Sequence, residues 1–134
     1  MVTNIVATKT TTFGGALLIA VGLLGFGVPG FLGMHLTALH NVLLLLSGTG
    51  AIYFGLKATP PAARAFCLVF GTLYGLLGLA GFVVGGIANT FTITIIPGAL
   101  VLGTMDHAAH LILGSIFVAV GWVERAATPA PATR

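Results

Sequence analysis

The chain has 134 residues, of which 57% are hydrophobic and 5% are charged, and a further 20 are glycine. A soluble domain is about a quarter charged, and a disordered chain combines low hydrophobicity with high charge, so this composition excludes both classes. The formal net charge of +3 reflects five scattered basic residues against two acidic ones, which is too dispersed for a nucleic-acid interface. We expect a small multi-pass membrane protein.

Four apolar segments are each long enough to cross a bilayer, which takes roughly 20 residues. We expect helices at residues 12–28, 36–56, 62–86 and 99–123, forming one membrane domain over residues 12–123. Proline and glycine punctuate the breaks between them. The first segment lacks a small-residue cleavage site, so we interpret it as a retained helix after a short N-terminal segment, residues 1–11. The Pro- and Ala-rich residues 124–134 predict a disordered tail.

The basic residues indicate the topology. They fall before the first helix, around the second connection and after the fourth helix: Lys9, Lys57, Arg64, Arg125 and Arg134. The other two connections, residues 29–35 and 87–98, contain neither Lys nor Arg. By the positive-inside rule both termini are expected to be cytoplasmic, in a bacterial inner membrane.

The two halves of the chain resemble each other. Residues 78–82 (GLAGF) repeat residues 22–26 (GLLGF) at an offset of 56, and Gly114 and Gly121 repeat Gly48 and Gly55 at an offset of 66. Two hairpins that cross the membrane in the same sense imply a pseudo-twofold axis along the membrane normal. The predicted fold is therefore an all-α bundle of four transmembrane helices built from two parallel-repeat hairpins.

Glycine spacing predicts how the helices pack. Each helix carries a pair of glycines seven residues apart, which places both on nearly the same face. In lipid, helices associate through close backbone approach at small residues. The expected packing positions are Gly15, Gly22, Gly48, Gly55, Gly71, Gly78, Gly114 and Gly121.

The outer connection in the second half has its own pattern. Residues 89–96 alternate polar and apolar side chains and are rich in β-branched residues. This period of two predicts an extended, half-buried segment over the mouth of the bundle.

Ionisable groups within membrane segments are functional candidates by default. Here they gather at the starts of the second and fourth helices: His35, His40, Asn41, Asp106, His107 and His110. If the halves superpose, His40 corresponds to Asp106, Asn41 to His107 and Leu44 to His110. Polar groups would then recur near the pseudo-twofold axis.

Two interpretations of this polar cluster stay open. Asp106 and His110 are four residues apart and share a helix face, so the carboxylate could orient the imidazole toward a ligand, a proton or a neighbouring helix. In the favoured structural interpretation, Asp106 caps the fourth helix and His110 hydrogen-bonds to the second. A metal site, or a haem held by His40 or His110, would need the second and fourth helices to touch.

Some of these residues also mark a resemblance. Residues 63–66 (ARAF) and 70–82 (FGTLYGLLGLAGF) resemble the third helix of a bacterial family of uncharacterised four-helix membrane proteins, a family defined by a domain of unknown function. That family shows a His-Asn opening on helix two, matched by His40 and Asn41. Its helix four carries an Asp, a His four residues later and a Gly four beyond, matched by Asp106, His110 and Gly114.

The resemblance extends from Phe13 to Val123. It departs at Leu44, where the family often has a second histidine, and at His107, which is additional here. The resemblance implies the four-helix fold and its topology, and it implies no activity.

The favoured functional hypothesis is a non-enzymatic accessory or scaffold subunit that packs with other membrane proteins or with itself and needs no cofactor. The alternative is a small protein that binds haem, a chlorophyll-type pigment or a metal through His40 and His110. A small transporter or proton-handling protein ranks third. An enzyme is not expected, because the chain has no nucleophile–base pair, P-loop or dinucleotide motif, and the lone Cys67 is interpreted as a small apolar residue.

Overall fold

The computed structural model describes residues 5–126, and side chains as far as residue 124. It is 79% helical, which confirms the all-α fold, and its four long helices are each long and apolar enough to cross a membrane. In chain order the elements are α1 (Ile5–Gly27), η1 (Phe31–Gly33), α2 (Ala38–Leu56), α3 (Pro60–Ala88), β1 (Ile93–Ile96), β2 (Leu100–Leu102) and α4 (Thr104–Ala126).

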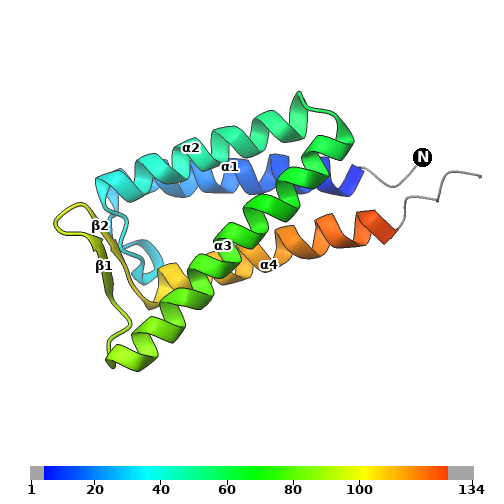
Figure 1. The fold of residues 1–134 in the computed structure, drawn as a ribbon. Coiled ribbons are helices and arrows are strands. Elements are labelled where there is room, and N and C mark those ends of the chain that lie inside the picture. The colour runs from blue at the N-terminus through cyan, green and yellow to red at the C-terminus, as the bar shows by residue number, and fades with distance from the viewer. Residues whose placement is uncertain (1–4, 127–134) are drawn as a thin grey trace, which may run out of the picture.

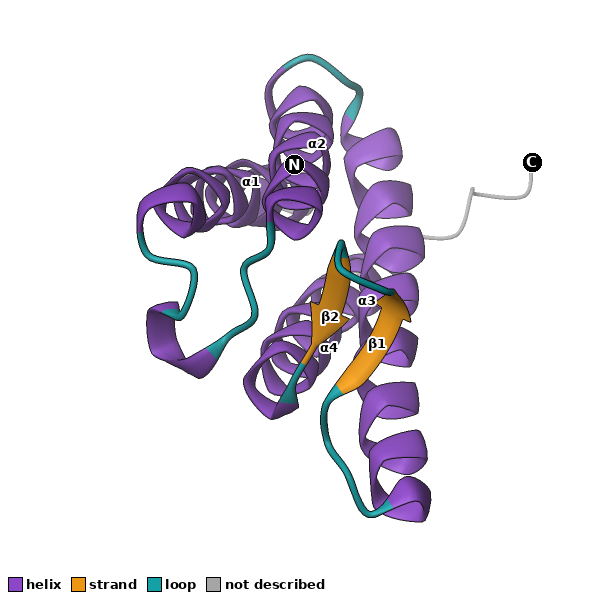
Figure 2. Ribbon diagram, turned by 90° about the vertical axis from the view of Figure 1, so that its left-hand side faces the viewer, coloured by secondary structure: helices purple, strands orange, loops and turns teal. Residues whose placement is uncertain are grey.

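The helices form two antiparallel hairpins, α1 with α2 and α3 with α4, which contact each other far less than their own members do (Figure 1). The start of α1, the α2–α3 turn and the end of α4 lie at one end of the molecule. At the other end, the α1–α2 connection lies beside the β1–β2 hairpin (Figure 2). Lys9, Lys57 and Arg64 belong to elements at the first end.

Two predicted boundaries are wrong. The first helix begins at Ile5 rather than residue 12, because the threonine hydroxyls of its first turns donate to backbone carbonyls three or four residues earlier, as Thr11 does to Ala7 at 2.9 Å. The last helix begins at Thr104 rather than residue 99, because Leu100–Leu102 pairs with the expected extended segment as a β-strand. Residues 124–126 also continue α4, while the rest of the predicted tail lies outside the described residues.

The predicted extended segment is largely exposed rather than half-buried. Three of the four residues of β1 are exposed, whereas Leu100 and Leu102 of β2 are buried. The two strands pair antiparallel. β2 packs against α2 and α4, and β1 forms the exposed outer edge of the pair.

Close glycine contacts hold each hairpin together. A Cβ on Gly48 would lie 2.6 Å from the carbonyl oxygen of Gly15, and a Cβ on Gly71 would lie 2.8 Å from that of Gly114. Real Cβ atoms do not approach so closely, and the helix backbones therefore meet only where side chains are absent. All eight glycines singled out by spacing face the partner helix of their own hairpin closely, six of them against its backbone and Gly55 and Gly121 first against side chains.

Aromatic rings fill the centre between the hairpins. Phe66, Phe70 and Tyr74 follow one another along α3, with ring centroids 5.0 and 4.1 Å apart, and Phe117 of α4 packs against Phe70 at 5.1 Å. Tyr74 in turn lies 4.9 Å from the ring of His110. The aromatic core thus leads directly to the polar residues near the β-hairpin end.

Candidate functional site

Asp106, in the first turn of α4, is fully buried and is the hub of the site. Its carboxylate accepts hydrogen bonds from the backbone N–H of Gly103 at 2.7 Å and from that of His35 at 3.0 Å. The Nδ1 atom of His35 lies 3.3 Å from the same carboxylate. These donors and the positive end of the helix dipole offset the cost of burying the charge.

The carboxylate therefore has two structural tasks. It caps α4, since an acidic residue at this helical position reaches back to the N–H just before the helix. It also holds the α1–α2 connection against α4 through His35, which couples the two hairpins.

His40 lies in the first turn of α2, where Thr37 caps the helix by accepting from the His40 backbone N–H at 3.3 Å. Its ring is 4% exposed, and its Nδ1 lies 2.9 Å from the carbonyl oxygen of His35. Asp106 is 3.7 Å from the same nitrogen. The ring is thus fixed in orientation on its Nδ1 side.

His110 lies one turn beyond Asp106, but its ring does not pair with the Asp106 carboxylate, which was one of the two interpretations left open. Its Nδ1 bonds instead to the backbone carbonyl of Asp106, 2.5 Å away. The carboxylate is already occupied by His35 and Gly103, so the imidazole turns to its own helix. The expected hydrogen bond from His110 to the second helix is not among the described contacts; its ring instead faces that of His40, with centroids 5.9 Å apart and planes 17° from parallel.

These contacts determine which ring nitrogen carries the proton in the neutral form of each histidine. A carbonyl oxygen can only accept, so Nδ1 of His40 and Nδ1 of His110 must each carry the proton. Each Nε2 is then left with a lone pair. Within residues 5–126, no hydrogen bond to either Nε2 is found, and neither atom is sealed off from the surrounding space.

Both histidines line a groove of about 520 Å³ between the hairpins. Apart from His40, Tyr74, Asp106 and His110, its walls are apolar: Leu17, Leu18, Val21, Phe31, Leu32, Met34, Leu44, Met105, Ala108, Ala109, Ile112, Leu113 and Ile116. Leu17, Ile112 and Ile116 are roughly half exposed on helices that are long and apolar enough to cross a membrane, so the groove opens sideways, through an apolar face. A concave, mostly apolar site with a few converging polar atoms is typical of small-molecule binding.

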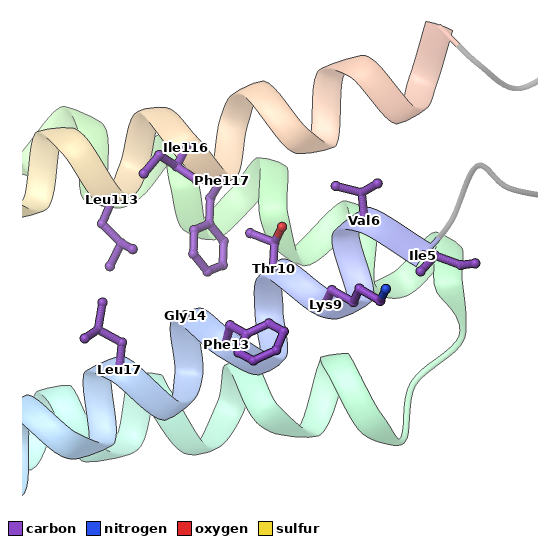
Figure 3. A pocket seen from close by; sticks show the side chains of 10 residues that line it. All are labelled: Ile5, Val6, Lys9, Thr10, Phe13, Gly14, Leu17, Leu113, Ile116 and Phe117. Carbon is purple, nitrogen blue, oxygen red and sulfur yellow. The ribbon is translucent and has the colours of Figure 1, made fainter.

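A second hollow of about 420 Å³ continues along the same seam toward the start of α1. Figure 3 shows Leu17 and Leu113 facing each other across it, with Lys9 near its far end. Phe117 packs over Gly14, where a Cβ would come within 2.6 Å of the ring. Leu17, Leu113 and Ile116 line both hollows. The groove and the second hollow therefore form one continuous apolar seam between α1 and α4.

Asn41 and His107 do not join this site, so the polar cluster predicted from the sequence is divided. Asn41 faces Gly25 of α1 and donates to the carbonyl of Leu36 at 3.2 Å. His107 is 1% exposed and packs against Gly81 of α3. Neither ring nitrogen of His107 has a hydrogen-bond partner among the described residues.

Tyr74 is the residue whose place in the site the sequence did not reveal. It lines the groove and its ring contacts that of His110. At the offset of 56, Tyr74 corresponds to Leu18 of the first half. A hydroxyl-bearing residue where the first half has an apolar one was the available signal. Among residues 5–126, no three His, Cys, Asp or Glu side chains are grouped so as to hold a metal ion.

Comparison with protein-family models, with curated proteins and with solved structures finds no match to this chain. The resemblance to a family of four-helix membrane proteins therefore stays a prediction.

Proposed function

We propose that this protein is a non-enzymatic, multi-pass membrane protein that holds a lipid-soluble ligand between its two hairpins. The observation that carries the proposal is the pair of histidines in the groove. Both rings are nine-tenths buried and both are held through Nδ1 by backbone carbonyls, and neither Nε2 has a partner within residues 5–126. A polar atom that faces an apolar groove is costly without a hydrogen-bond partner, and a ligand in the groove would supply one.

The lipid-facing opening supports the same proposal. A ligand that partitions into the bilayer reaches the groove sideways, without crossing water. The accessory-subunit hypothesis draws on the nearly uncharged surface, a property that multi-pass membrane proteins share, and gains no separate support from this geometry.

Membrane placement follows from the fold and the charges together. We infer that both termini face the cytoplasm of a bacterial cell and that the β-hairpin lies on the outer side, because the basic residues Lys9, Lys57 and Arg64 gather at the opposite end. The groove then opens in the outer half of the membrane.

Matching contacts support the proposed internal repeat. Gly15 meets Gly48 in the first hairpin as Gly71 meets Gly114 in the second. Gly22 faces the carbonyl of Asn41 as Gly78 faces that of His107, which preserves the offsets of 56 and 66. His40 and Asp106, equivalent under the same offsets, lie 3.7 Å apart where the two halves meet.

The test is gentle purification from the native membrane, followed by an absorption spectrum, solvent extraction and mass spectrometry. We expect a stoichiometric lipophilic compound that is lost in a His40→Phe, His110→Phe double variant and retained in His107→Leu, the matched change outside the groove. A visible band lost with the same pair would identify a haem or pigment, the ligand class that coordinates through Nε2. Protein that folds normally and carries no compound would reject the proposal.

A further inference from the structure

The chemistry of the groove narrows the class of ligand, an inference that rests on the proposed ligand-binding function. We infer that the ligand is a neutral amphiphile with a hydroxyl head and a long apolar tail. Its hydroxyl donates a hydrogen bond to Nε2 of His40 or His110, and its tail lies along the seam between α1 and α4.

The head must be a donor because the free protein atoms are acceptors. Nδ1 of each ring is committed as a donor to a backbone carbonyl, so Nε2 of the neutral ring offers only a lone pair. A carbonyl or ether oxygen placed there would meet a second acceptor. A hydroxyl can donate the hydrogen bond that Nε2 accepts. Its oxygen would then lie in the groove, which Tyr74 also lines.

The head must also be neutral. Among the described residues, no Lys or Arg lines the groove that holds the two histidines. Asp106 is one of the residues around the groove, and its buried carboxylate would repel an anion placed there. A phosphate head, or the carboxylates of a haem, would therefore be buried without a cationic partner.

The tail follows from depth and continuity. His110 lies six residues after Thr104, a rise of about 9 Å along an α-helix, so the head would sit just inside one membrane surface. From there the groove continues into the second hollow past Leu17, Leu113 and Ile116 (Figure 3). A tail in this seam would run along the membrane normal, as lipid chains do, toward the Lys9 end.

Two sources share this chemistry, quinols and aliphatic lipid alcohols. Decylubiquinol, its oxidised form decylubiquinone and the isoprenoid alcohol farnesol are titrated into the purified full chain in detergent, and binding is followed by native mass spectrometry and calorimetry. We expect saturable binding of decylubiquinol about tenfold tighter than that of decylubiquinone, which has the same tail and no donor. Comparable binding of farnesol would show that any hydroxyl head suffices, and much weaker binding would point to quinols; either result supports the inference.

Variants separate the head from the tail. His110→Phe and His40→Phe should reduce the preference for quinol over quinone, whereas Ile116→Trp should weaken both probes about tenfold by filling the seam. Leu46→Trp, an equally outward-facing position of α2 outside both hollows, should change neither. The comparison of the two redox forms on the unmodified protein needs no variant to fold.

Quinone binding as tight as quinol binding would overturn the hydroxyl head and leave the ligand-binding function standing. Binding unaffected by Ile116→Trp would overturn the placement of the tail. Absence of saturable binding by decylubiquinol and by farnesol would overturn the ligand class, while the compound extracted from the native protein decides the function separately.

Discussion

The carboxylate of Asp106 binds the backbone N–H of His35 at 3.0 Å, although 71 residues separate the two in sequence. Through this bond a buried charge on the second hairpin holds the outer connection of the first. Because the donor is a backbone group, the identity of the side chain at position 35 matters much less than the carboxylate itself.

Asp106→Asn should therefore destabilise the protein. An amide carries no charge, so the bonds from His35 and Gly103 lose their charge assistance, and an amide NH2 in place of Oδ1 would face the His35 N–H 3.2 Å away, at a cost of about 2 kcal/mol. Helical circular dichroism against the mole fraction of sodium dodecyl sulfate measures the free energy of unfolding. His35→Ala, which keeps the backbone N–H and removes a half-exposed ring, should cost less than about 1 kcal/mol. Equal losses in the two variants would contradict the assigned role of the backbone bond.

The glycine contacts give a second prediction, within a single helix. Gly48→Ala should destabilise the first hairpin by about 1–3 kcal/mol, because the new Cβ would lie 2.6 Å from the Gly15 carbonyl oxygen and 2.7 Å from Ile19. Gly50→Ala, where nothing lies within 4 Å, should be neutral or stabilise by up to about 1 kcal/mol through helix propensity. The same unfolding assay compares them, and a similar loss at both positions would argue against the helix contact seen here.

The isolated histidine leads to a third prediction. Both ring nitrogens of His107 are buried without a partner among the described residues, so His107→Leu should leave stability unchanged or raise it by about 1 kcal/mol. The comparison is Asp106→Asn, the adjacent residue, which should lose stability. A marked loss in His107→Leu would show that its ring has a polar partner in the membrane, such as a bound water.

Topology can be tested with two cysteines in a Cys67→Ala background. Thr92, before β1, and Thr59, in the α2–α3 turn, are both exposed threonines at opposite ends of the molecule. A membrane-impermeant maleimide applied to intact cells should label Thr92→Cys and should label Thr59→Cys only after the membrane is permeabilised. The reverse pattern would invert the proposed orientation.

The helices were predictable because long apolar segments in so uncharged a chain have few alternatives. Their ends were not, because an isolated run such as Leu100–Leu102 fits a strand as well as a helix until its partner in β1 is known. Likewise, the hydroxyl of Thr11 donates to a backbone carbonyl of its own helix. A hydropathy pattern counts Thr11 as polar and does not reveal this bond.

The site was predictable in its residues and not in its connections. The sequence placed His40 and His110 at similar depth, but their approach depends on how the two hairpins dock. The partner of Asp106 is a backbone group, which side-chain patterns do not reveal. His107 was grouped with the others by proximity in sequence, although one position further along a helix turns a side chain by about 100°.

The sparse contact between the hairpins has a consequence for biogenesis. Each hairpin is closed by local contacts, which form quickly, whereas the groove is created only when the second hairpin docks on the first. Docking of the hairpins is thus the last step of assembly, and its equilibrium is the one that a bound ligand can shift. A ligand that fits the groove would bind only the docked state and would therefore stabilise the folded protein. Cellular levels of the protein should then follow the supply of that ligand.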